Sequence, residues 1–176
     1  LFFVQESLAK YITAADETAN ISIARWKILV NDEDIRDENT VNTVINPVFL
    51  GNDNIAENII APTSEGYFDL IIDAREADVS FKYKISMSVN QNSSVKDLVA
   101  TKYVVNGGEP ITMDINNQTI ENTVLYGNNN STINIRVYIV WNDGDGSLMD
   151  NSADTLATTS GNSAMMNVSL NFTQVV

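Results

Sequence analysis

The side chains that could perform chemistry in this chain are mostly carboxylates. There are 23 Asp and Glu residues, but no His and no Cys. Without His the chain lacks the usual general base and the commonest zinc ligand, and without Cys or His it lacks every Ser-His or Cys-His nucleophile pair. The sequence contains no glycine-rich phosphate loop, no HExxH motif and no nucleophile elbow. It therefore predicts a protein that is not an enzyme and that needs no cofactor.

One group of carboxylates is a candidate metal site. Asp143, Asp145 and Asp150 lie in a glycine-containing stretch, and carboxylate oxygens are the ligands that calcium prefers. The twelve-residue calcium loop ends in a glutamate, whereas the twelfth residue counted from Asp143 is Asp154. The spacing favours a plain acidic loop over a calcium site.

Asparagine offers a second kind of chemistry, because Asn-x-Ser/Thr is the acceptor sequence for N-linked sugars. Seven such sites occur, at Asn20, Asn92, Asn117, Asn129, Asn130, Asn167 and Asn171. We expect glycosylation at these positions only in a source that has the machinery.

The charge balance limits the partners. Ten basic residues stand against 23 acidic ones, which gives a net charge of −13. A chain this acidic is repelled by phosphate backbones and by anionic membrane surfaces, so nucleic acid is not an expected partner. At 176 residues, 44% of them hydrophobic, the chain is long enough and apolar enough to bury a core of its own.

The elements that must carry these residues are strands, because apolar and polar residues alternate with a period of two. The clearest runs are 67–73, 79–89, 132–141 and 166–175. The residues expected to face the core are Phe68, Leu70, Ile72, Val79, Phe81, Tyr83, Ile85, Met87, Val89, Ile133, Ile135, Val137, Ile139, Trp141, Met166, Val168, Leu170 and Phe172.

Weaker signals complete the strand count. Residues 21–30 predict a first strand, 44–50 an edge strand that contains Pro47, and 119–125 a short strand. Residues 98–115 predict a hairpin whose tip is Asn106-Gly107-Gly108, a turn that needs positive φ angles. Eight or nine strands with no long helix predict an all-β, jelly-roll-like antiparallel β-sandwich over residues 21–176, preceded by an N-terminal arm and linker over residues 1–20.

The first thirteen residues form an apolar arm whose large side chains are Leu1, Phe2, Phe3, Val4, Leu8, Tyr11 and Ile12. The arm is too short to span a bilayer, which takes about 20 apolar residues. Three interpretations remain open: the end of a secretory signal with small residues at Ser7 and Ala9, the first strand of the domain, or a protruding strand that completes the sheet of a neighbouring subunit.

Four segments together resemble a known family in strand order and turn placement. They are Lys10–Thr13, Ala19–Trp26, Ala61–Asp73 and Val79–Tyr83, and they resemble secreted proteins of the TasA/camelysin type. The resemblance implies a jelly-roll domain that polymerises, as in biofilm-matrix fibres and the related archaeal bundling pili, by inserting an N-terminal strand into the next subunit. It implies a donor strand within Leu1–Thr13, a head-to-tail homopolymer at the cell surface, and a cell-surface anchor protein as a further partner. Camelysin's peptidase activity is not implied, because the chain has neither His nor HExxH.

Two functions of different kinds follow as expectations. The first is a structural subunit of an extracellular filament or pilus, assembled by donor-strand complementation. The alternative is a monomeric secreted binding module for carbohydrate, for which Tyr67 and Tyr138 are the candidate exposed aromatics. A third reading, a type IV pilin, needs a long apolar helix, and the arm is too short to supply one.

Overall fold

The fold is built from two antiparallel β-sheets and is known from a computed structural model that describes residues 27–35, 40–142 and 163–175. Sheet I contains the strands β1 (Leu29–Val30), β2 (Glu33–Asp34), β4 (Val48–Phe49), β5 (Glu65–Asp73), β7 (Leu98–Val105), β8 (Ile111–Thr112) and β10 (Ile133–Trp141). Sheet II contains β3 (Thr40–Ile45), β6 (Phe81–Val89), β9 (Thr119–Val124) and β11 (Met166–Gln174).

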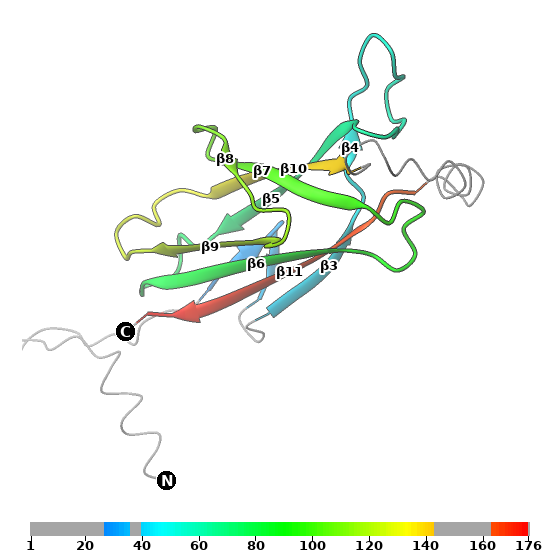
Figure 1. Cartoon of the computed structure of the whole chain (residues 1–176). Helices are drawn as coiled ribbons and strands as arrows, with labels where there is room; N and C mark the ends of the chain where they lie inside the picture. The colour runs from blue at the N-terminus through cyan, green and yellow to red at the C-terminus, as the bar shows by residue number, and fades with distance from the viewer. Residues whose placement is uncertain (1–26, 36–39, 143–162, 176) are drawn as a thin grey trace, which may run out of the picture.

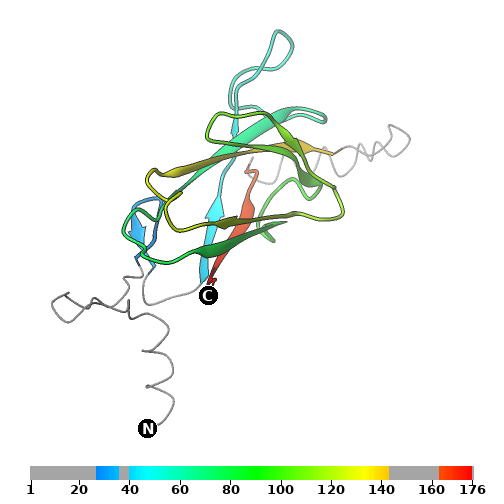
Figure 2. The ribbon, with the colours of Figure 1, turned by 90° about the vertical axis from the view of Figure 1, so that its left-hand side faces the viewer.

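The long strands alternate between the two sheets along the chain. Sheet I has the order β2-β1-β5-β10-β7-β8, with β4 also on β5, and sheet II has the order β3-β11-β6-β9. The path from β5 through β6, β7, β9 and β10 to β11 changes sheet at each step between long strands, so the chain winds around the sandwich in a jelly-roll-like manner (Figures 1 and 2). The prediction of an all-β antiparallel sandwich is confirmed, while the predicted arm lies outside the described residues.

The core lies between the sheets and is filled by the alternate residues that the sequence predicts. All the residues expected to face inward on β5, β6, β10 and β11 are buried, except Val79, Val89 and Ile133, which are half-buried near strand ends. On β5, for example, Leu70 is buried while its neighbour Ile71 is 42% exposed on the outer face. This alternation is what a sheet with one face on the core and one face in water requires.

The prediction of one edge strand over residues 44–50 is wrong. The segment is divided at Asn46-Pro47 into the end of β3, which pairs with β11 in sheet II, and β4, which pairs with β5 in sheet I. Proline has no N–H for a sheet ladder, and Pro47 lies where the chain passes from one sheet to the other. The short strand β4 packs closely on Gly66, where an added Cβ would lie 2.8 Å from the Phe49 ring.

The hairpin prediction is confirmed at its turn. Asn106 and Gly107 have positive φ angles of 51° and 69°, and β7 pairs with β8. The second strand is shorter than predicted, since β8 ends at Thr112. A further loop, residues 50–61, projects from the end of the sandwich near β4 (Figures 1 and 2).

Candidate functional site

Strand β3 is the strongest candidate for a binding site, because it is an edge strand that could pair with a further strand. It forms one edge of sheet II, with β11 on one side and no strand of the described residues on the other. Its sequence, Thr-Val-Asn-Thr-Val-Ile, contains no charged residue, no Pro and no Gly. Native proteins usually protect an edge with charges, proline or bulges, and β3 has none of these.

The hydrogen-bond ladder shows which backbone groups of β3 point away from β11. Asn90 N–H donates to Met165 C=O at 3.0 Å. Because hydrogen bonds alternate along an antiparallel strand, the backbone groups of the odd residues of β11 point toward β6, and those of the even residues point toward β3. Val41, Thr43 and Ile45 are the partners of those even residues. The backbone N–H and C=O groups of the alternate residues, Asn42 and Val44 among them, therefore point away from the sheet.

The side chains behind this edge are only partly covered. Val41 and Ile45 point inward but remain half-buried, as does Ile60, and all three pack against the core. Across the sandwich, the matching edge of sheet I consists of two short pieces, because β4 pairs with β5 at residues 66–67 and β1 pairs at residues 72–73. We call this side of the sandwich, formed by β3 and the facing gap between β4 and β1, the open side.

Side-chain amides protect other edges of the sheets. On β7, Gln118 donates from Nε2 to Ala100 C=O at 3.0 Å and accepts from Ala100 N–H at Oε1 at 2.7 Å, as the backbone of a neighbouring strand would. On β5, Asn31 donates its N–H to Ile71 C=O and accepts the Ile71 N–H at Oδ1, each at 2.9 Å. Each amide thus occupies the outward backbone groups of one residue, Ala100 on β7 and Ile71 on β5, where a further strand would otherwise pair.

The far edge of sheet II, β9, is protected by charge. Glu121 forms ion pairs with Lys82 at 2.6 Å and Lys84 at 3.1 Å. Hydrogen bonds from these two ammonium groups hold the pKa of Glu121 below its ordinary value. In addition, Thr123 N–H is capped by Asn122 Oδ1 at 2.8 Å. Among the described strands, β3 is thus the long edge with the least protection.

The two tyrosines proposed for carbohydrate lie side by side, which the sequence did not reveal. Tyr67 and Tyr138 are directly opposite each other on β5 and β10. However, the Arg136 guanidinium lies 4.0 Å from the centre of the Tyr67 ring and Lys102 lies 4.6 Å from that of Tyr138. A sugar that stacked on these ring faces would have to displace a cation, which disfavours a preformed stacking platform.

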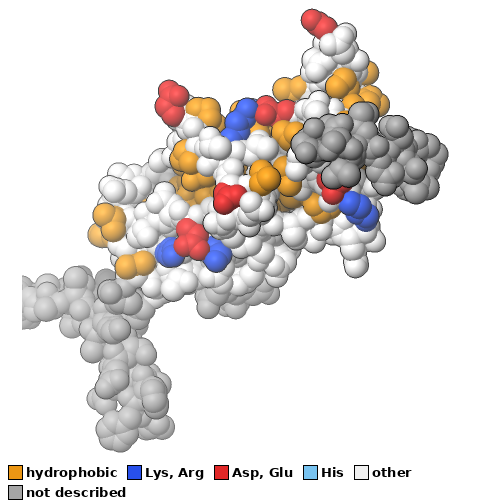
Figure 3. All heavy atoms as spheres, in the orientation of Figure 1, with side chains coloured by type: hydrophobic (Ala, Val, Ile, Leu, Met, Phe, Trp, Pro, Cys, Tyr) orange, Lys and Arg blue, Asp and Glu red, His pale blue; other side chains and the backbone are white. Residues whose placement is uncertain are grey.

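The same face is neutralised by its own ion pairs. Arg136 makes two hydrogen bonds to Asp69, at 2.7 and 2.8 Å, which raise the pKa of the guanidinium. Lys102 pairs with Glu65 at 2.9 Å. Figure 3 shows acidic and basic side chains interspersed on the visible face of the described residues, with no large patch of one sign.

The chain was compared with known proteins in three ways. A scan against protein-family models, a search of curated proteins and a search of solved structures each found no match.

Within the described ranges no group of three or more Asp or Glu residues could hold a metal ion. No helix in that part of the chain is long and apolar enough to cross a membrane.

The remaining predicted site residues fall in two groups. The arm residues Leu1 to Ile12, the acidic loop at Asp143, Asp145 and Asp150, and Asn20 lie outside the described residues. Of the other sugar acceptors, Asn92, Asn117, Asn130 and Asn171 are exposed and Asn167 is half-buried.

Asn129 is the exception among the sugar acceptors. It is only 8% exposed, and its Nδ2 donates to Ala74 C=O at 2.9 Å and to Ala77 C=O at 2.7 Å. An N-linked sugar is attached to that nitrogen, so the folded protein does not present Asn129 for glycosylation. This side chain has a structural role.

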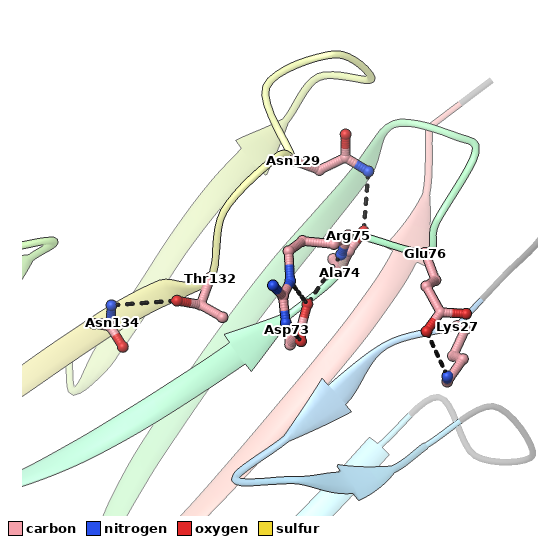
Figure 4. A network of polar contacts seen from close by, with 8 residues as sticks. All are labelled: Lys27, Asp73, Ala74, Arg75, Glu76, Asn129, Thr132 and Asn134. Atoms are coloured by element: carbon pink, nitrogen blue, oxygen red, sulfur yellow. Dashed lines mark hydrogen bonds and ion pairs between the residues drawn. The ribbon is translucent and has the colours of Figure 1, made fainter.

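A polar network ties the first described residues to the turn after β5 (Figure 4). Lys27 pairs with Glu76 at 2.7 Å, and Asp73 accepts hydrogen bonds from Arg75 at 2.9 and 2.7 Å. The Arg75 hydrogen bond holds the pKa of Asp73 below its ordinary value of 3.8, although partial burial acts in the opposite direction.

This lowered pKa makes a small part of the stability depend on pH. Because the folded pKa lies below the unfolded one, the contribution of Asp73 is present above pH 3.8 and is lost as the pH falls through the folded value. We expect Asp73→Asn to unfold at lower urea concentration than the wild type at pH 7, with the difference shrinking below pH 3.8. Urea titrations from pH 7 to about pH 2 measure this, and a difference that grows in acid would contradict the assignment.

Proposed function

We propose that this protein is a structural subunit of an extracellular filament, in which residues 1–13 of one copy complete the sandwich of the next. The observation that carries the proposal is the open side, where an uncharged edge strand lies beside half-buried Val41 and Ile45. Strand addition at an exposed edge joins main-chain hydrogen bonds to burial of alternate side chains. The apolar arm supplies side chains suited to that burial, and the role needs no catalytic residue.

Removal of the arm tests the proposal. We expect the full chain to form filaments one subunit wide, and a truncated chain that starts at Ala14 to remain monomeric, because it keeps the acceptor but lacks the donor. Electron microscopy and sedimentation of the two proteins at equal concentration give the result. Normal filaments from the truncated chain would refute the proposal.

A matched pair of variants separates the arm's chemistry from its length. Phe2→Ser combined with Phe3→Ser removes two apolar side chains, whereas Gln5→Ser combined with Glu6→Ser changes two polar ones at the same chain length. We expect the first pair to weaken filament formation strongly and the second to leave it nearly unchanged. Equal effects would mean that apolar burial does not drive assembly.

A further inference from the structure

We infer that β3 is the strand that accepts the arm, and that its occupant is residues 1–13 of a second copy of this chain. This inference rests on the proposed function and names the acceptor, for which four sheet edges compete. Three observations select β3: its outward backbone groups, the partial cover of the residues behind it, and the amide caps and ion pairs on other edges.

The first observation concerns the backbone. The outer edge of β3, opposite its partner β11, is six residues long, and no described strand pairs with it. The backbone N–H and C=O groups of Asn42 and Val44 point outward along this edge, because the hydrogen bonds of an antiparallel strand alternate between its two sides. At about 3.3 Å per residue the edge is roughly 20 Å long, and an extended thirteen-residue arm reaches about 43 Å. The arm is long enough to pair along the whole of β3.

The second observation concerns the side chains. A strand added beside β3 would place alternate side chains over the inward-facing Val41 and Ile45 and toward Ile60, which are half-buried. The arm brings seven large apolar residues to this place. Val44, on the outer face of β3, is 53% exposed. The side chains on the outer face of the added strand would cover it in part.

The third observation concerns the alternatives. Gln118 occupies the backbone groups of Ala100 on β7, Asn31 occupies those of Ile71 at the β1 end of β5, and Glu121 with its two lysines protects β9. A pairing of β3 with β3 of a second copy would be two-fold symmetric and would stop at a dimer, whereas an arm and a separate acceptor on each copy make an open, head-to-tail polymer. The arm is therefore the occupant that suits a filament.

Proline substitution at two edges tests the choice of acceptor. Asn42→Pro removes an N–H that points away from β11, and such a position on an edge strand tolerates proline. Thr119→Pro is the matched control at the start of β9, where Met87 N–H bonds to Gln118 C=O and the next N–H, that of Thr119, therefore points outward. We expect Asn42→Pro to fold, with an unfolding transition near that of Thr119→Pro, but to form no filaments, and Thr119→Pro to polymerise as the wild type does.

The outcomes separate the two proposals. If Asn42→Pro forms normal filaments and the chain that starts at Ala14 forms none, the proposed filament function stands and β3 is rejected as the acceptor. Filaments from the truncated chain would reject the proposed function itself. A dimer that survives truncation would mean that β3 pairs with β3, which overturns the inference.

Cross-linking gives the same answer without relying on a fold-sensitive variant. The chain has no cysteine, so Asn42→Cys combined in turn with single cysteines along residues 1–13 reports only the introduced pairs. For one or two arm positions we expect oxidation to give a series of disulfide-linked oligomers on a non-reducing gel. We expect no such series when Thr119→Cys replaces Asn42→Cys. A series only from Thr119→Cys would assign the arm to β9 and overturn the inference.

Discussion

Leu70→Ala should lower the free energy of unfolding by about 2–5 kcal/mol, because a buried leucine leaves a cavity in addition to the lost transfer energy. Leu70 is fully buried at the middle of β5, where it pairs with Ile135 of β10 on one side and lies between the short β4 and β1 pairings on the other. For a domain of this size each kcal/mol lowers Tm by roughly 2–4 °C, so a loss near 10 °C is expected. Thermal unfolding followed by circular dichroism measures it.

Ile71→Ala is the matched control for this prediction. Ile71 is the next residue of the same strand but points outward and is 42% exposed. Its truncation should cost less than about 1 kcal/mol, the usual span of strand-surface substitutions. If the two variants lose the same stability, the alternation of β5 described above is wrong.

Asn129→Ala should cost about 1–3 kcal/mol, because it removes the donor to the buried Ala77 C=O and one of the two donors to Ala74 C=O, which still accepts the Ala77 N–H at 3.0 Å. Asn130→Ala, at the exposed neighbouring position, should stay within about 0.5 kcal/mol. Urea unfolding of the two variants gives the comparison. A neutral result for Asn129→Ala would show that the Ala77 carbonyl finds another donor.

The isosteric change Asn129→Asp sharpens the test through pH. The introduced carboxylate would lie close to two carbonyl oxygens, at the 2.9 and 2.7 Å that now separate them from Nδ2. Repulsion and burial raise the folded pKa of such a carboxyl, so the loss of stability is fully present at neutral pH and shrinks as the pH falls and the group becomes a donor. A loss independent of pH would argue against this geometry.

The regular part of the fold follows from local pattern. On β6, Phe81, Tyr83, Ile85 and Met87 alternate with polar residues, and all four are buried as predicted. Such a period of two determines which face of a strand meets the core. It does not determine the neighbouring strand, so the order of either sheet could not be predicted.

The open side was missed for a physical reason of the same kind. Residues 44–50 are apolar apart from Asn46, and the sequence alone cannot show that Asn46-Pro47 divides them between two sheets. The amide caps depend on partners distant in sequence, such as Asn31 with Ile71 and Asn129 with Ala74. The available signal was that Thr40–Ile45 contains no charged residue, Pro or Gly, because such residues usually protect an edge strand.

The most direct test of strand exchange between copies mixes two proteins that each lack one half of the contact. Asn42→Pro keeps the arm without the acceptor, and the chain that starts at Ala14 keeps the acceptor without the arm. Analytical ultracentrifugation of each protein alone and of an equimolar mixture is the measurement. We expect two monomers that combine into a one-to-one complex and grow no further. Two species that remain separate in the mixture would contradict it.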